Sequence, residues 1–166
     1  RASYVVIVEA RIPTGIVTSY DTGKVFGPMG EVLTKARDIE ERLREYIVRA
    51  FPSEAARNTA VGRVFSDPDK RDLDHLTFGD LLEIIWNREN WRLFEPCLES
   101  QDMFRRRMTP ARNIRNDIAH FRRTVVPTDI PQMKKSLEWL YAQPRLPEAN
   151  VEVGFDAFLV QWPTGE

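Results

Sequence analysis

The stretch Arg105–Arg123 reads RRRMTPARNIRNDIAHFRR and is the most informative part of the 166-residue chain. It holds seven arginines and one acidic residue, so its formal charge is +6. An ideal α-helix advances about 100° per residue, which places Ala111, Ile118 and Phe121 within about 60° of Ile114. An apolar stripe of this kind is typical of a helix that buries one face, so the stretch predicts a helical protein with a packed core.

The polar side chains of this helix fall on its other half. Four of them lie about 100–240° from the centre of the apolar stripe: Arg112, Arg115, Asn116 and His120. A histidine moves protons at neutral pH, and an arginine fork stabilises the added charge of a phosphodiester transition state. Asn116 would orient the imidazole or bind phosphate. RNA carries its own nucleophile, the 2′-hydroxyl, so this set predicts RNA cleavage that needs no metal.

The charge of the chain is unevenly distributed. The net charge is −1, so the residues outside the +6 stretch sum to −7. A local cationic surface of this kind attracts phosphate even in an acidic protein. We therefore predict that RNA is bound by the flanking arginines Arg105, Arg106, Arg107, Arg112, Arg122 and Arg123. The alternative is that the arginine–histidine face is simply solvated, as polar helix faces usually are.

Arg115-Asn116-Asp117-Ile118-Ala119-His120 matches the Arg–Asn–x–x–x–His motif of the HEPN superfamily of nucleotide-binding helical domains. The apolar segments predicted at 76–82, 86–94 and 129–141 resemble the helices around this motif in one HEPN subgroup of bacterial defence and RNA-processing proteins. The resemblance covers about residues 30–142. It implies a mainly α fold, an antiparallel helical bundle that forms a homodimer.

The resemblance also implies an activity. Active HEPN members are metal-independent endoribonucleases that cleave single-stranded RNA, with Arg115 and His120 catalytic and Asn116 in support. No cofactor is implied, and the biological setting would be defence or a toxin–antitoxin pair with an antitoxin as partner. A dimer would also supply a second histidine, which helps because acid and base roles both need one. Two alternatives stay open. One is a non-catalytic RNA- or nucleotide-binding or dimerisation module that nucleotides regulate through the CBS-like N-terminal segment described next. The other is a structural domain whose arginines dock an acidic partner.

Two short strands are predicted at the N-terminus, at 4–8 and 16–18, separated by a turn at Pro13–Gly15. The segment Gly15–Asp21 resembles the second half of a CBS module (the cystathionine-β-synthase type), in which Gly–x–x–Thr–x–x–Asp follows an apolar strand. The resemblance implies that Thr18 and Asp21 contact the ribose and phosphate of an adenine nucleotide in the full protein. Alternatively, both residues cap the next helix.

The remaining pattern is mostly helical. Helices are predicted at 29–51, at 53–65 behind a Ser53 cap, from a Thr77–Asp80 capping box, at 100–107, from Pro110 to Arg123 and from Asp129 to Tyr141. Alternation at 151–155 and 158–162 predicts a C-terminal β-hairpin. The predicted division is 1–28 as a partial CBS-like segment, 29–148 as a HEPN-like domain and 149–166 as a strand-like tail.

Composition limits the function classes. Apolar residues make up 42% of the chain, enough for a core. One cysteine, Cys97, and two histidines exclude a disulfide framework and a multi-thiolate metal site, so no metal is predicted. His75, beside a predicted helix cap, is expected at the surface. No apolar run reaches the roughly 18 residues of a membrane span, so we expect no membrane partner and a cytoplasmic location.

Overall fold

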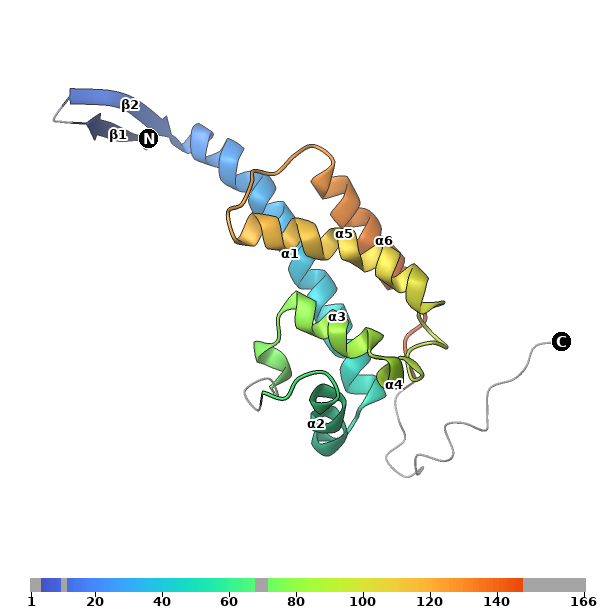
Figure 1. Cartoon of the computed structure of the whole chain (residues 1–166). Coiled ribbons are helices and arrows are strands. Elements are labelled where there is room, and N and C mark those ends of the chain that lie inside the picture. The colour runs from blue at the N-terminus through green and yellow to red at the C-terminus, as the bar shows by residue number, and fades with distance from the viewer. Residues whose placement is uncertain (1–3, 10–11, 68–71, 148–166) are drawn as a thin grey trace. The chain divides into compact units, whose positions relative to one another are not determined.

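The structure, a computed structural model, describes residues 4–9, 12–67 and 72–147 (Figure 1). Within these ranges the chain is mainly helical, which confirms the predicted fold class. No helix in the described part is both long and apolar enough to cross a membrane. The predicted C-terminal hairpin, at 151–155 and 158–162, lies outside the described residues.

The N-terminal strands form an antiparallel pair, β1 (Tyr4–Glu9) and β2 (Ile12–Thr18). The turn predicted at Pro13–Gly15 was wrong, because those residues belong to β2. The register shifts between Ile7 and Val8, which pair with Gly15 and Pro13 respectively. Thr14 is the extra residue of this β-bulge, and Pro13 lies beside it, where strands accept proline.

Helix α1 (Ser19–Ala50) follows β2 directly. We predicted its start at residue 29, ten residues too late, because Pro28 and the nearby glycines resemble a break. Pro28 lies inside the helix instead. A proline there removes one backbone hydrogen bond, which a long helix can tolerate. The predicted segment boundary between residues 28 and 29 therefore falls within a continuous helix.

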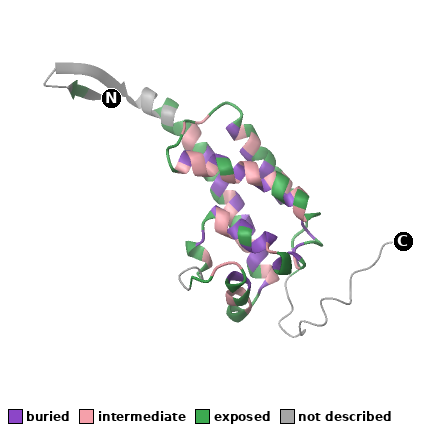
Figure 2. Ribbon diagram, in the orientation of Figure 1, coloured by how far each residue is buried: buried purple, intermediate pink, exposed green. Residues whose placement is uncertain are grey.

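By its internal contacts the chain groups into two units, residues 1–41 with 102–142 and residues 42–101 with 143–166. In the first unit, α1 contributes buried Val32, Ala36 and Ile39. The other helices of this unit are α5 (Gln101–Ala119) and α6 (Asp129–Ala142), whose buried residues are purple in Figure 2.

Contacts between α5 and α6 show that the two helices run antiparallel. Near the start of α5, the ring centroids of Phe104 and Trp139 lie 6.2 Å apart. One turn further along α5, the hydroxyl of Ser136 donates a 2.7 Å hydrogen bond to the carbonyl of Arg107. Since positions later in α5 meet positions earlier in α6, the pair forms an antiparallel hairpin of helices.

Our prediction of two separate helices around Thr109–Pro110 was wrong, because α5 is continuous and Pro110 lies inside it. The buried side chains explain this continuity. They keep one helical stripe on both sides of the proline: Phe104, Met108, Ala111, Ile114 and Ile118. Burying this stripe outweighs a proline penalty of about 3 kcal/mol. The start signal read from Thr-Pro was therefore overridden by packing.

The second unit contains the end of α1, α2 (Glu54–Gly62), η2 (Leu73–His75), α3 (Phe78–Trp86) and α4 (Arg88–Trp91). The predicted caps are confirmed: Ser53 accepts from the backbone of Ala56, and Thr77 forms a capping box with Asp80. α3 ends earlier than its apolar run suggests. Asn87 both ends α3 and caps α4, so the packing continues through a second short helix.

Candidate functional site

The end of α5 carries the predicted catalytic motif in the first unit. The Arg122 amide donates to the Asp117 carbonyl at 2.8 Å, and the Phe121 amide donates to the Ile118 carbonyl at 3.1 Å. These two bonds define a Schellman motif in which His120 is the C-cap and Phe121 the following left-handed residue, with φ 53°. The motif therefore runs from Arg115, just before the last turn of α5, to the cap residue His120.

The predicted apolar stripe is buried for three of its four members. Ala111, Ile114 and Ile118 are buried, but Phe121 is 76% exposed. The prediction for Phe121 was wrong because the helix ends at Ala119, so the 100° step no longer applies two residues later. The aromatic ring therefore lies at the surface next to the motif.

Arg115 is positioned from two sides. Its Nε lies 3.4 Å from Oε1 of Glu40 on α1, and its Nη1 donates to Oδ1 of Asn116 at 3.4 Å. The side chains of Arg115 and Glu40 are 24% and 14% exposed, so the ion pair is largely shielded from water. Asn116 thus contacts the guanidinium group, and His120 is exposed at the helix end.

Sequence reasoning missed Glu40. In the sequence it is one of several acidic residues on the polar side of α1, and no local pattern distinguishes it from its neighbours. Its role depends on which helix packs against α1, which periodicity does not specify.

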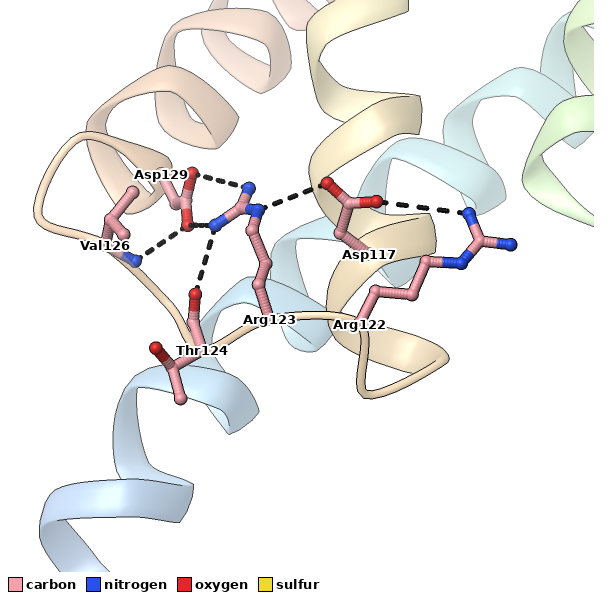
Figure 3. Close-up of polar contacts among 6 residues, drawn as sticks. All are labelled: Asp117, Arg122, Arg123, Thr124, Val126 and Asp129. Carbon is pink, nitrogen blue, oxygen red and sulfur yellow. Dashed lines mark hydrogen bonds and ion pairs between the residues drawn. The ribbon is translucent and has the colours of Figure 1, made fainter.

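Arg123 was predicted to bind RNA, but in the structure it joins α5 to α6 (Figure 3). Its Nη1 and Nη2 donate to the two carboxylate oxygens of Asp129 at 2.6 and 3.1 Å, and its Nε donates to Asp117 at 3.1 Å. Oδ2 of Asp129 also accepts from the amide of Val126 at 2.9 Å. We call this group, Asp117, Arg123, Val126 and Asp129, the loop clamp.

The loop clamp has a strong electrostatic component. The hydrogen bonds from Arg123 hold the pKa of the Asp129 carboxyl below its usual range, and the same bonds raise the pKa of the Arg123 guanidinium. The Asp129 side chain is only 5% exposed, so its charge needs this partner. The clamp fixes the loop that follows His120. Asp117, to which we assigned no role from the sequence, anchors it from inside the motif.

The other arginines predicted to bind RNA differ in exposure. Three are exposed: Arg105, Arg106 and Arg122. Arg122 also lies 4.0 Å from Asp117. Arg107 and Arg112 are half-buried, and Nε of Arg107 is a buried atom without a partner in the described part of the chain. The cations at the surface therefore lie at both ends of α5.

The nucleotide-binding prediction concerns the junction of β2 and α1. Thr18 is the last residue of β2 and pairs with Tyr4, and Asp21 lies in the first turn of α1. The structure thus places both residues where a strand meets a helix, as the sequence pattern expects. Ligand binding there stays a prediction.

The remaining chemical candidates are structural. Cys97 is buried, and burial raises the pKa of its thiol, so it is a packed side chain. His75 is exposed at the end of η2, with Nδ1 3.4 Å from the Asp72 cap. Among the described residues, no three His, Cys, Asp or Glu side chains are grouped closely enough to hold a metal ion.

Comparison with known proteins gives no relative: no family model, curated protein or solved structure matches the chain. The HEPN and CBS resemblances therefore depend on the sequence patterns quoted above.

Proposed function

We propose that this chain is a metal-independent endoribonuclease of the HEPN type that cleaves single-stranded RNA. The observation that supports this most is the arrangement at the end of α5. Arg115 is held by Glu40 and Asn116, and His120 is exposed at the cap. A fixed guanidinium and an accessible imidazole on one helix end are the two groups that phosphodiester transfer needs.

The reaction uses the substrate's own nucleophile. The 2′-oxygen attacks phosphorus as a base removes its proton, and the bond from phosphorus to the 5′-oxygen breaks as an acid protonates that oxygen. The products are a 2′,3′-cyclic phosphate and a 5′-hydroxyl. His120 exchanges these protons, because imidazole can accept and donate a proton near neutral pH.

Arg115 stabilises the phosphate as it gains charge. A guanidinium offers five N–H donors, and the ion pair with Glu40 and the bond to Asn116 engage Nε and Nη1. Glu40 fixes the orientation of the group, so less conformational entropy is lost when phosphate binds. Glu40 is thus a positioning residue.

A homodimer completes the site in this proposal. Residues five apart on a helix are separated by about 140° around its axis, so Arg115 and His120 of one copy do not share one narrow face. A second copy related by a two-fold axis would bring its own arginine and histidine to the same RNA strand. One histidine would then act as base and the other as acid.

The test is RNA cleavage in EDTA. We expect the purified chain to cut a single-stranded oligoribonucleotide and to leave its all-deoxy counterpart intact. Arg115→Ala and His120→Ala should each abolish cutting. Matched controls are Arg88→Ala and His75→Ala, which remove exposed residues of the same types in the other unit. Cleavage that persists in both motif variants would contradict the assignment.

The Glu40 contact also favours a second candidate function, RNA binding without turnover. An arginine already paired with a carboxylate carries less net positive charge toward phosphate. A binding module predicts that the wild-type chain retains RNA intact in EDTA and that Arg115→Ala weakens retention. The same cleavage assay therefore separates the two functions.

A further inference from the structure

Phe121 has the highest exposure among the large apolar side chains whose burial the structure describes, at 76%. It directly follows His120, and its neighbour Arg122 is 66% exposed. A single exposed phenylalanine needs no explanation by itself. The backbone conformation of Phe121, however, is unusual.

The backbone of Phe121 is in the left-handed region, with φ 53°. L-residues with a bulky side chain avoid this region, and glycine is the usual residue at this position of a Schellman motif. Phe121 therefore combines an unfavourable backbone with an exposed ring, and both features lower stability. Such combinations persist where function requires them and the surroundings enforce them.

The surroundings of Phe121 do enforce this conformation. The Arg122 amide is bonded to the backbone carbonyl of Asp117. Arg123 is bonded to the carboxylates of Asp117 and Asp129 in the loop clamp (Figure 3). The chain is thus fixed immediately after Phe121. Because of this, the ring is presented at the surface by a constrained loop and not by a freely moving one.

The charged side chains beside Phe121 indicate which kind of ligand its ring contacts. His120 precedes it and the exposed Arg122 follows it, whereas Arg123 is paired with Asp117 and Asp129 in the loop clamp. Sites for single-stranded nucleic acid combine cations that track the phosphates with aromatic rings on which bases stack.

We propose that Phe121 is a base-stacking residue that binds a nucleobase of single-stranded RNA next to the phosphate held by Arg115. This inference rests on the proposed function and adds to it a subsite that recognises the base. Stacking tolerates any base because each has a π-face, so Phe121 would set affinity and position more than sequence preference.

The experiment uses a probe that cannot be cut, so stacking is measured independently of catalysis. The probe is a 2′-O-methyl oligoribonucleotide with one 2-aminopurine, whose fluorescence falls when the base stacks on an aromatic ring. Four variants are compared with the wild-type chain: Phe121→Gly, Phe121→Leu, Phe121→Trp and Phe26→Ala. Phe26 is a matched control, an exposed phenylalanine on α1 that is 57% exposed.

We expect Phe121→Gly to weaken binding about five- to 150-fold, in line with the usual contribution of one stacked base. The same variant should raise Tm by about 2–4 °C, because glycine adopts the left-handed region without strain. Phe121→Leu keeps an apolar side chain but has no π-face, so it should lose the quenching. Phe121→Trp and Phe26→Ala should both keep it.

Three results would overturn the proposal. The first is a wild-type chain that does not bind or quench the probe. The second is equal quenching by wild type and Phe121→Leu. The third is a Phe121→Gly variant that changes from dimer to monomer in sedimentation while each subunit binds RNA as before, which would assign the ring to a contact between copies. A chain that stacks the probe but cuts no RNA would retain this inference and reject the nuclease.

Discussion

The start of α3 and the end of α5 are both helix ends, but only the first is capped by side chains suited to that position. At the start of α3, the Asp80 amide donates to the Thr77 hydroxyl at 3.3 Å, and the Thr77 amide donates to the Asp80 carboxylate at 3.0 Å. Both side chains thus accept hydrogen bonds from backbone amides at the start of the helix. At the end of α5, a phenylalanine occupies a glycine position, and the histidine cap leaves its side chain exposed.

This difference indicates that local stability is lower at the end of α5 than at the start of α3. Sequences usually agree with their fold at every level, and disagreement concentrates at functional or strained sites. The α3 end is consistent at every level, so a structural role accounts for it completely. The end of α5 is not consistent in this way, because Phe121 combines a left-handed backbone with an exposed ring. It is also where the arginine–histidine motif lies. The two ends should therefore respond differently to substitution.

The largest expected effect concerns cleavage. Arg115→Lys keeps the charge but loses the planar fork, so cleavage should fall about 10²-fold, as when one transition-state donor is removed. Its Tm should stay within about 2 °C of wild type. Thr77→Ala at the α3 end should leave cleavage within about twofold. Cleavage rates in EDTA and thermal melts of Arg115→Lys and Thr77→Ala test this contrast. An equal loss of cleavage in both variants would contradict it.

The loop clamp should give the largest effect on stability. Asp129→Asn retains the shape of the side chain but leaves Arg123 with one acidic partner, Asp117. We expect a loss of about 2–3 kcal/mol in the free energy of unfolding, because the Asp129 carboxylate is almost fully buried. Urea denaturation at pH 7 measures it. A change below about 0.5 kcal/mol would show that the clamp does not hold the loop.

The same pair should respond to pH in one direction. Since Arg123 lowers the pKa of Asp129 in the folded chain, the pair stabilises the fold above the ordinary aspartate pKa of about 4. That stabilisation is lost as the pH falls through the lowered folded pKa. The difference between wild type and Asp129→Asn should therefore persist at pH 7 and shrink below about pH 4. A gap that widens in acid would contradict this assignment.

Glu40 should affect catalysis more moderately. In Glu40→Gln, Arg115 loses its ion-pair partner and its fixed orientation, so kcat should fall about tenfold. The KM for RNA should stay equal or decrease, because one negative charge near the phosphate is removed. Steady-state kinetics separate the two parameters. A higher KM with unchanged kcat would show that Glu40 does not position Arg115.

The smallest effect is expected at the α3 capping box. Thr77→Ala removes the acceptor for the Asp80 amide, which costs about 1 kcal/mol. Thr77→Ser keeps a hydroxyl and should restore most of the loss. Denaturant midpoints of the two variants test this, and equal midpoints would mean that the capping box contributes nothing measurable.

Much of the fold could be predicted because it depends on local pattern. The buried stripe of α5, the Ser53 and Thr77 caps and the start of α6 at Asp129 all follow from spacing and side-chain chemistry over a few residues. The predictions that were wrong depend on tertiary packing. Pro110 is helical because the residues on both sides of it pack in one stripe, and no local rule contains that information.

The candidate site was predictable only in part. The motif spacing identified Arg115, Asn116 and His120, but the Glu40 contact and the bond of Arg123 to Asp129 depend on which helices meet. Phe121 was misplaced because the helix was extended two residues too far. The sequence therefore indicates which groups are present, and the structure indicates which are exposed and which serve as anchors.

The identity of the RNA ends produced in EDTA tests the central claim most directly. An oligoribonucleotide labelled at either end would be incubated with the purified chain, and its fragments analysed by mass spectrometry. We predict 2′,3′-cyclic phosphates and 5′-hydroxyls, formed by the wild-type chain and absent with His120→Ala. Fragments that end in 3′-hydroxyl and 5′-phosphate, or RNA that stays intact with the wild-type chain, would contradict the account.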